Sequence, residues 1–159
     1  MNWDLATDII LYASFAALAV FAILGLTQLI HRKSLKKVDK PLLAMLVPFI
    51  LMAATYVIFD KFVVLNTRPD GSGEPSFPST HAMVVATIFA LVALALPRYI
   101  HSKAALITLD LLMLVLTVLV SCGRVLASKH WPSDVLGGLG FAAIFTLIYY
   151  LIIRRKKNA

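Results

Sequence analysis

Five long apolar stretches dominate the sequence, and four of them contain no charged residue, while the other contains only Asp110. Such stretches have about the length that a helix needs to cross a bilayer. Sixty per cent of the residues are hydrophobic, which is more apolar surface than the core of a soluble domain of this size can bury. We therefore predict an all-α polytopic membrane protein, a bundle of five transmembrane helices. The predicted spans are Ile9–Ile30, Pro41–Phe59, Ala82–Leu96, Ala104–Cys122 and Val135–Ile153.

Most basic residues fall in two short loops and the tail, which share one side of the membrane if the chain crosses it five times. They are Arg32, Lys33, Lys36, Lys37, Lys40, Arg98, Lys103, Arg154, Arg155, Lys156 and Lys157. The other side holds only Lys61, Arg68, Arg124 and Lys129. Because cytoplasmic loops carry the excess of Lys and Arg, we predict an outside N-terminus and a cytoplasmic C-terminus. The net charge of +7 then reflects topology, and we expect membrane lipids and no nucleic acid as partners.

A polar loop becomes an apolar helix at Pro78-Ser79-Thr80-His81. Ser79 is a good N-cap residue, which would leave Thr80 and His81 in the first helical turn. The free N–H groups and the positive end of the helix dipole at such a helix start favour anion binding. A histidine beside an anion can hold or pass a proton near neutral pH. The segment therefore predicts an anion site on the outer side.

A second histidine precedes the last span, in the segment Arg124–Asp134. Pro132 fits the first turn of a helix, which places His130 just before the helix and Asp134 about one turn into it. Asp134 could then reach one imidazole nitrogen and leave the other as a nucleophile or base. The alternative is that Asp134 only complements the helix dipole beside an interfacial histidine.

Two further cations stand on the outer side, at Lys61 and Arg68. A lysine at the end of a transmembrane helix commonly extends its ammonium to the membrane–water interface. An arginine followed by a proline is commonly a solvated loop residue. Each residue alone therefore has a simple structural explanation.

The three segments occur in a fixed order: K-x-x-x-x-x-x-R-P at Lys61–Pro69, P-S-x-H at Pro78–His81, and R-x-x-x-x-x-H-x-x-x-D at Arg124–Asp134. This order resembles the type 2 phosphatidic acid phosphatase superfamily, the membrane relatives of the vanadium haloperoxidases and bacterial acid phosphatases. The resemblance covers Lys61 to about Ile153. It implies a compact catalytic core at the outer membrane face. We expect a single domain, 1–159, with the motif-bearing core in 58–153 and an N-terminal span at 9–30.

The resemblance also implies residue roles. His130 would be the nucleophile that forms a phosphohistidine, Asp134 would orient His130, and His81 would be the general acid. The phosphate oxygens would be bound by Lys61, Arg68, Arg124, the Ser79 hydroxyl and the helix start at Thr80. Phosphoryl transfer needs mainly positioning and charge neutralisation, which fixed cations can supply. No Asp/Glu cluster could hold a metal, so we expect metal independence and no cofactor.

Three features depart from the family pattern. Gly123 stands where the family usually has a serine, so one hydroxyl contact to phosphate would be missing. Thr80 replaces the usual glycine and adds bulk near the phosphate. Many members have six spans, and the first has no counterpart here, so we expect the lateral access of lipid to differ.

The expected substrate is a lipid carrying a phosphate or pyrophosphate. An outward site on a small chain favours undecaprenyl pyrophosphate and a bacterial cytoplasmic (inner) membrane. Phosphatidylglycerophosphate and phosphatidic acid are alternatives. A non-catalytic protein that binds or translocates lipid phosphates is an alternative of another class, which would need the three cations but neither His130 as nucleophile nor Asp134 as its orienter.

Overall fold

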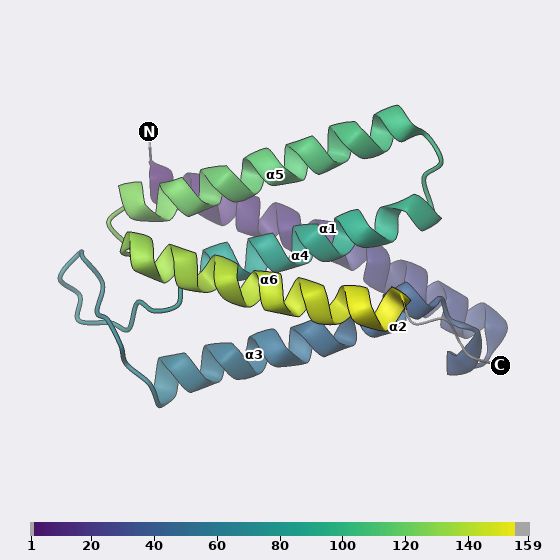
Figure 1. Ribbon diagram of the computed structural model, residues 1–159, viewed down its shortest axis with the longest axis horizontal. Helices are drawn as coiled ribbons and strands as arrows, with labels where there is room; N and C mark the ends of the chain where they lie inside the picture. Colours follow the sequence, from purple (N-terminus) through teal and green to yellow (C-terminus); the bar gives the residue numbers. More distant parts are fainter. Residues whose placement is uncertain (1, 155–159) are drawn as a thin grey trace.

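The computed structural model describes residues 2–154, which form a bundle of helices (Figure 1). Within these residues, five helical segments are long and apolar enough to cross a membrane. All five predicted spans are helical. The helices are α1 (Trp3–Arg32), α2 (Lys40–Ala44), α3 (Leu46–Lys61), α4 (Thr80–Ala95), α5 (Lys103–Leu126) and α6 (Pro132–Arg154), with short 3-10 turns η1 (Leu35–Lys37) and η2 (Leu96–Arg98).

The second predicted span is divided into α2 and α3. Pro41 lies in the first turn of α2, as expected. The division falls at Met45, three residues before Pro48. Proline has no N–H to donate to the carbonyl four residues earlier, and its ring crowds that carbonyl. Pro48 therefore accounts for the end of α2 at Ala44.

The first span begins earlier than expected, because α1 starts at Trp3 rather than Ile9. Asn2 caps this helix, since its side chain accepts a hydrogen bond of 3.2 Å from the N–H of Leu5. The additional turns carry Asp4 and Asp8 into the helix. They bring these carboxylates to the end of the bundle that holds the predicted motifs.

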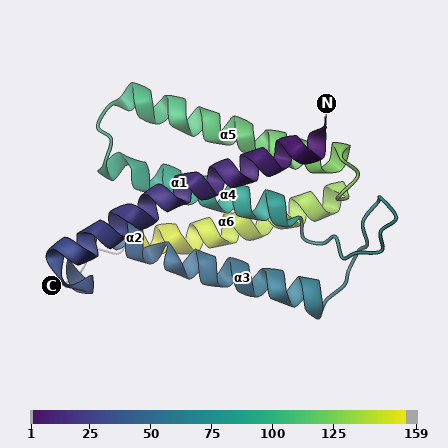
Figure 2. The ribbon, with the colours of Figure 1, turned by 180° about the vertical axis from the view of Figure 1, so that it is seen from behind.

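Helix α4 is the centre of the bundle and packs against α6, α5 and α1 (Figures 1 and 2). Inside the protein, 56% of its span is buried, against 6–22% of the other four spans. Close approach to α6 depends on Gly138, where a Cβ atom would lie 2.6 Å from the carbonyl oxygen of Ser79. Large apolar side chains on the outer helices remain exposed, as hydrocarbon surroundings require.

The two ends of the bundle differ in charge. At one end, which we call the basic end, lie the 33–39 and 99–102 connections (Figure 1). Asp39 joins these connections, because it accepts hydrogen bonds from Gln28 at 2.9 Å, Arg98 at 3.1 Å and Tyr99 at 3.1 Å. At the other end, the site end, lie the start of α1, the 62–79 loop and the 127–131 turn.

Candidate active site

The 62–79 loop folds back over the site end. Its two arms meet at a bridge between Thr67 and Pro75, and the N–H of Ser76 donates to the carbonyl of Asn66 at 2.9 Å. The indole N–H of Trp131 donates to the Thr67 carbonyl at 2.9 Å, which ties the loop to the turn before α6. The loop thus places its carbonyls and Arg68 beside the second histidine.

His130 is buried, and its Nδ1 lies 2.8 Å from the carbonyl oxygen of Ser76. A carbonyl can only accept, so Nδ1 carries the proton and Nε2 keeps its lone pair. Burial, and then the nearby Arg124 guanidinium, lower the pKa of His130 to about 4. At neutral pH the ring is therefore uncharged and able to act as a nucleophile through Nε2.

Asp134 is fully buried, and its carboxylate accepts hydrogen bonds from groups other than the His130 imidazole. One oxygen accepts from the N–H of Trp131 at 2.9 Å, and the other accepts from the Asn66 side chain at 2.8 Å. The first bond closes the start of α6 in the manner of a capping box. The nearest Asp134 oxygen lies 3.9 Å from Nδ1 of His130. The bond to Nδ1 that was expected from Asp134 is thus made by the Ser76 carbonyl, and the Asp134 carboxylate faces His130 without a direct hydrogen bond.

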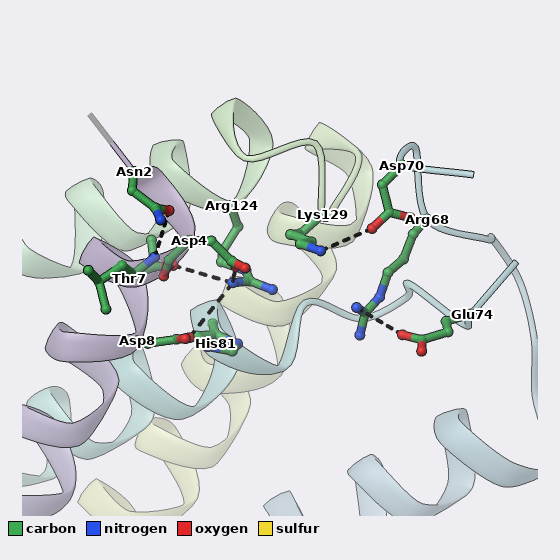
Figure 3. A network of polar contacts seen from close by, with 11 residues as sticks. Asn2, Asp4, Thr7, Asp8, Arg68, Asp70, Glu74, His81, Arg124 and Lys129 are labelled. Carbon is green, nitrogen blue, oxygen red and sulfur yellow. Dashed lines mark hydrogen bonds and ion pairs between the residues drawn. The ribbon is translucent and has the colours of Figure 1, made fainter. Parts of the chain in front are cut away.

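Arg124 is 4% exposed and projects from the end of α5. Its Nη1 donates to Asp4 at 2.7 Å and to the Thr7 hydroxyl at 3.3 Å, as Figure 3 shows. Arg68 approaches from the 62–79 loop and pairs with Glu74 at 2.9 Å. The two arginines line one cavity together with His81 and His130.

Four buried side-chain polar atoms in residues 2–154 have no hydrogen-bond partner, and all four belong to this region. They are Arg68 Nε, Ser76 Oγ, Ser79 Oγ and Arg124 Nε. Buried donors that lack a partner are costly. Two of the four are guanidinium donors, so an anion would be stabilised here.

Ser79 occupies the N-cap position of α4, and Thr80 and His81 lie in the first turn, which confirms the predicted helix start. The Ser79 hydroxyl makes no capping bond, and the Ser79 N–H instead donates to the Asp134 carbonyl at 2.9 Å. The Ser79 hydroxyl therefore has no hydrogen-bond partner within the described residues and is available to a ligand. Thr80 lines the cavity.

The cavity has a volume of about 250 Å³ and joins a polar part to an apolar part. Its apolar wall comes from α1, α3 and α4, through Leu11, Phe15, Tyr56, Phe59 and Val84. Lys61 does not line the cavity, because its ammonium pairs with Asp60 at 2.7 Å and its side chain is 69% exposed. The structure therefore does not bring Lys61 together with the other predicted phosphate ligands.

Three residues of α1 reach the site and were not expected there: Asp4, Thr7 and Asp8. Oδ1 of Asp8 lies 2.8 Å from Nε2 of His81. Thr7 packs closely against Gly123, because a Cβ atom added to Gly123 would lie 2.6 Å from Cγ2 of Thr7. The Thr7 hydroxyl also accepts from Arg124. Thr7 of α1 thus occupies the space that a serine side chain at position 123 would need. The spacing of Asp4 and Asp8, four residues apart on one helical face, was the available signal.

Curated relatives are similar to part of the chain. The Lipid A 1-phosphatase of Rhizobium johnstonii is 36% identical over 84 residues, which cover 53% of this chain and 30% of the relative. The Undecaprenyl-diphosphatase of Sulfolobus acidocaldarius is 32% identical over 104 residues, which cover 65% of this chain and 41% of the relative. The chain thus matches less than half the length of these relatives.

A solved structure has the same fold. The transmembrane PAP2 type phosphatidylglycerolphosphate phosphatase from Bacillus subtilis superposes with a TM-score of 0.69 at 22% sequence identity, over 96% of this chain and 78% of that protein. The likeness identifies the fold as that of a multi-pass membrane protein. The model of the PAP2 superfamily matches residues 16–158, which is most of the sequence, and the chain belongs to the PAP2 superfamily.

Proposed function

We propose that the protein is a metal-independent membrane lipid phosphatase, a single domain that hydrolyses a terminal phosphate through a phosphohistidine. The observation that carries the proposal is the environment of His130. Its Nε2 keeps a lone pair in a cavity that Arg68 and Arg124 also line. The apolar part of the same cavity would accept the start of a lipid tail.

The reaction has two steps. His130 Nε2 attacks the phosphorus, the bond from phosphorus to the leaving oxygen breaks, and His81 gives that oxygen a proton. Water then attacks the phosphohistidine, His81 takes a proton from it, and phosphate and the free imidazole result. Arg68, Arg124, the Ser79 hydroxyl and the helix start at Thr80 would hold the phosphate oxygens.

The buried carboxylate of Asp134 would favour the positive charge on His130 while the ring is phosphorylated. Its distance of 3.9 Å suits this electrostatic role rather than a direct hydrogen bond. Lys61 would contribute little, because its side chain points to Asp60.

Undecaprenyl pyrophosphate is the substrate we favour, and phosphatidylglycerophosphate and phosphatidic acid are the alternatives. The named substrates of the relatives share a phosphate on a lipid, which supports the class. The charge difference between the two ends of the bundle supports an outward site end, with the basic end in the cytoplasm of a bacterium.

The test is phosphate release from the three lipids by purified protein in detergent with EDTA. We expect turnover by the wild type and loss of at least about a hundredfold in His130→Ala. His101→Ala is the matched control, because His101 is an exposed histidine at the basic end. Tight lipid binding without turnover by the wild type would favour the binding or translocating protein instead.

A further inference from the structure

A second histidine–carboxylate pair lies in the site, between α1 and α4. Nε2 of His81 is 2.8 Å from an oxygen of Asp8 (Figure 3). A carboxylate accepts, so Nε2 carries a proton in this pair. His81 also lines the cavity, which leaves its other ring nitrogen, Nδ1, for a ligand there.

Packing of α1 fixes the position of Asp8. Thr7 beside it is 1% exposed and fits directly against Gly123, and Asp4 accepts a bond of 2.7 Å from the buried Arg124. Exposed ion pairs commonly contribute little because their side chains are mobile. Here the helical turn that leads to Asp8 is held in place by the buried Thr7 and by the bond between Asp4 and the buried Arg124.

We propose that Asp8 is a positioning residue for His81, which orients the ring and keeps its Nε2 proton in place so that Nδ1 serves as the general acid. The proposal rests on the function proposed above. When His81 gives the Nδ1 proton to the leaving oxygen, the neutral ring keeps Nε2–H on Asp8. Nδ1 is then the nitrogen that takes a proton from the attacking water.

Other charges also face His81. Asp4 from α1 and Arg124 from α5 are close, and Arg68 and His130 line the same cavity. Asp8 also lies 4.0 Å from Nη1 of Arg124. It could therefore act through phosphate binding instead, and the two roles predict different kinetics.

The leaving group separates the two roles. An alkoxide needs a proton as it departs, whereas p-nitrophenolate is stable without one. Both substrates present the same phosphate to Arg124. We would measure kcat/KM for dodecyl phosphate and p-nitrophenyl phosphate, because this parameter reports the step in which the leaving group departs.

In Asp8→Asn, kcat/KM for dodecyl phosphate is expected to fall about 10- to 100-fold, and the value for p-nitrophenyl phosphate about twofold or less. Asp8→Glu should recover part of the loss. Asp4→Asn is the matched control, since Asp4 bonds Arg124 rather than His81, and it should change both substrates alike.

In a His81→Ala background, Asp8→Asn should have no further effect on dodecyl phosphate. Equal losses for both substrates in Asp8→Asn, or a full further loss in the His81→Ala background, would overturn the role of Asp8. Turnover that persists in His130→Ala would instead refute the proposed function, whatever Asp8 does.

Discussion

Gly123→Ser restores the residue that the family pattern usually has at this position, and the structure predicts that it is harmful here. A Cβ atom at Gly123 would lie 2.6 Å from Cγ2 of Thr7 and 3.4 Å from the ring of Trp3. Carbon atoms pack at about 3.5–4.0 Å, so α1 would have to move by about 1 Å. Thr7 is buried, and its hydroxyl bonds the Asp4 carbonyl and Arg124, so a rotation that moved its methyl group away would break these bonds.

Overpacking of this kind costs about 1–3 kcal/mol, and about 2–4 °C in melting temperature per kcal/mol for a chain of this size. We therefore expect Gly123→Ser to melt about 2–12 °C lower in detergent. The same shift would move Asp4 away from its 2.7 Å contact with Arg124, so phosphatase activity should fall as well.

Two variants act as controls for Gly123→Ser. Thr7→Ser removes the obstructing methyl group and keeps the hydroxyl that bonds Arg124, so Gly123→Ser/Thr7→Ser should regain most of the lost stability. Gly140→Ser adds the same side chain where no heavy atom lies within 4 Å of the new Cβ, and it should be close to neutral. An unchanged or raised melting temperature and activity in Gly123→Ser would refute the packing argument and indicate that the serine hydroxyl itself is useful.

Two further predictions concern the opposite end and the cations. Asp39→Ala should lower the free energy of unfolding by about 2–4 kcal/mol, because Asp39 accepts several charge-assisted or neutral hydrogen bonds at the basic end. Bonds from Arg98, Gln28 and Tyr99 lower the pKa of Asp39 in the fold. Its contribution is therefore present above about pH 4, the unfolded value, and declines as the pH falls below it, which thermal melts of wild type and variant at several pH values would detect. Arg124→Ala should lower kcat/KM by at least about a hundredfold, whereas Lys61→Ala should lower it by less than about threefold; similar losses in the two variants would contradict the placement of Lys61 outside the cavity.

The sequence predicted most of the helices, but neither the division of the second span at Met45 nor the start of α1 at Trp3. The apolar stretches predicted the five spans. Ser79 predicted the helix start that carries His81, and Pro132 predicted the helix start that follows His130. These signals are local, because capping and proline preferences act within a turn.

The contacts that the sequence analysis did not predict depend on a backbone carbonyl, on helix packing and on the direction of one side chain. The partner of His130 is the backbone carbonyl of Ser76, which any residue could supply. Asp4 and Asp8 reach the site only because α1 packs against α4 and α5, and a span boundary drawn at Ile9 excludes them. The direction of Lys61 depends on its neighbour Asp60, which the motif spacing does not consider.

Within the described part of the chain, each cation at the site end already faces a carboxylate. Lys61 pairs with Asp60, Arg68 with Glu74, Arg124 with Asp4 and Lys129 with Asp70. Of these cations, Arg68 and Arg124 line the cavity, so a ligand there must compete with Glu74 and Asp4 for them. A terminal phosphate carries close to two negative charges and competes well, whereas the phosphodiester of an ordinary membrane lipid carries one and competes poorly. We therefore expect these ion pairs to favour a terminal phosphate over the phosphodiesters of a surrounding bilayer.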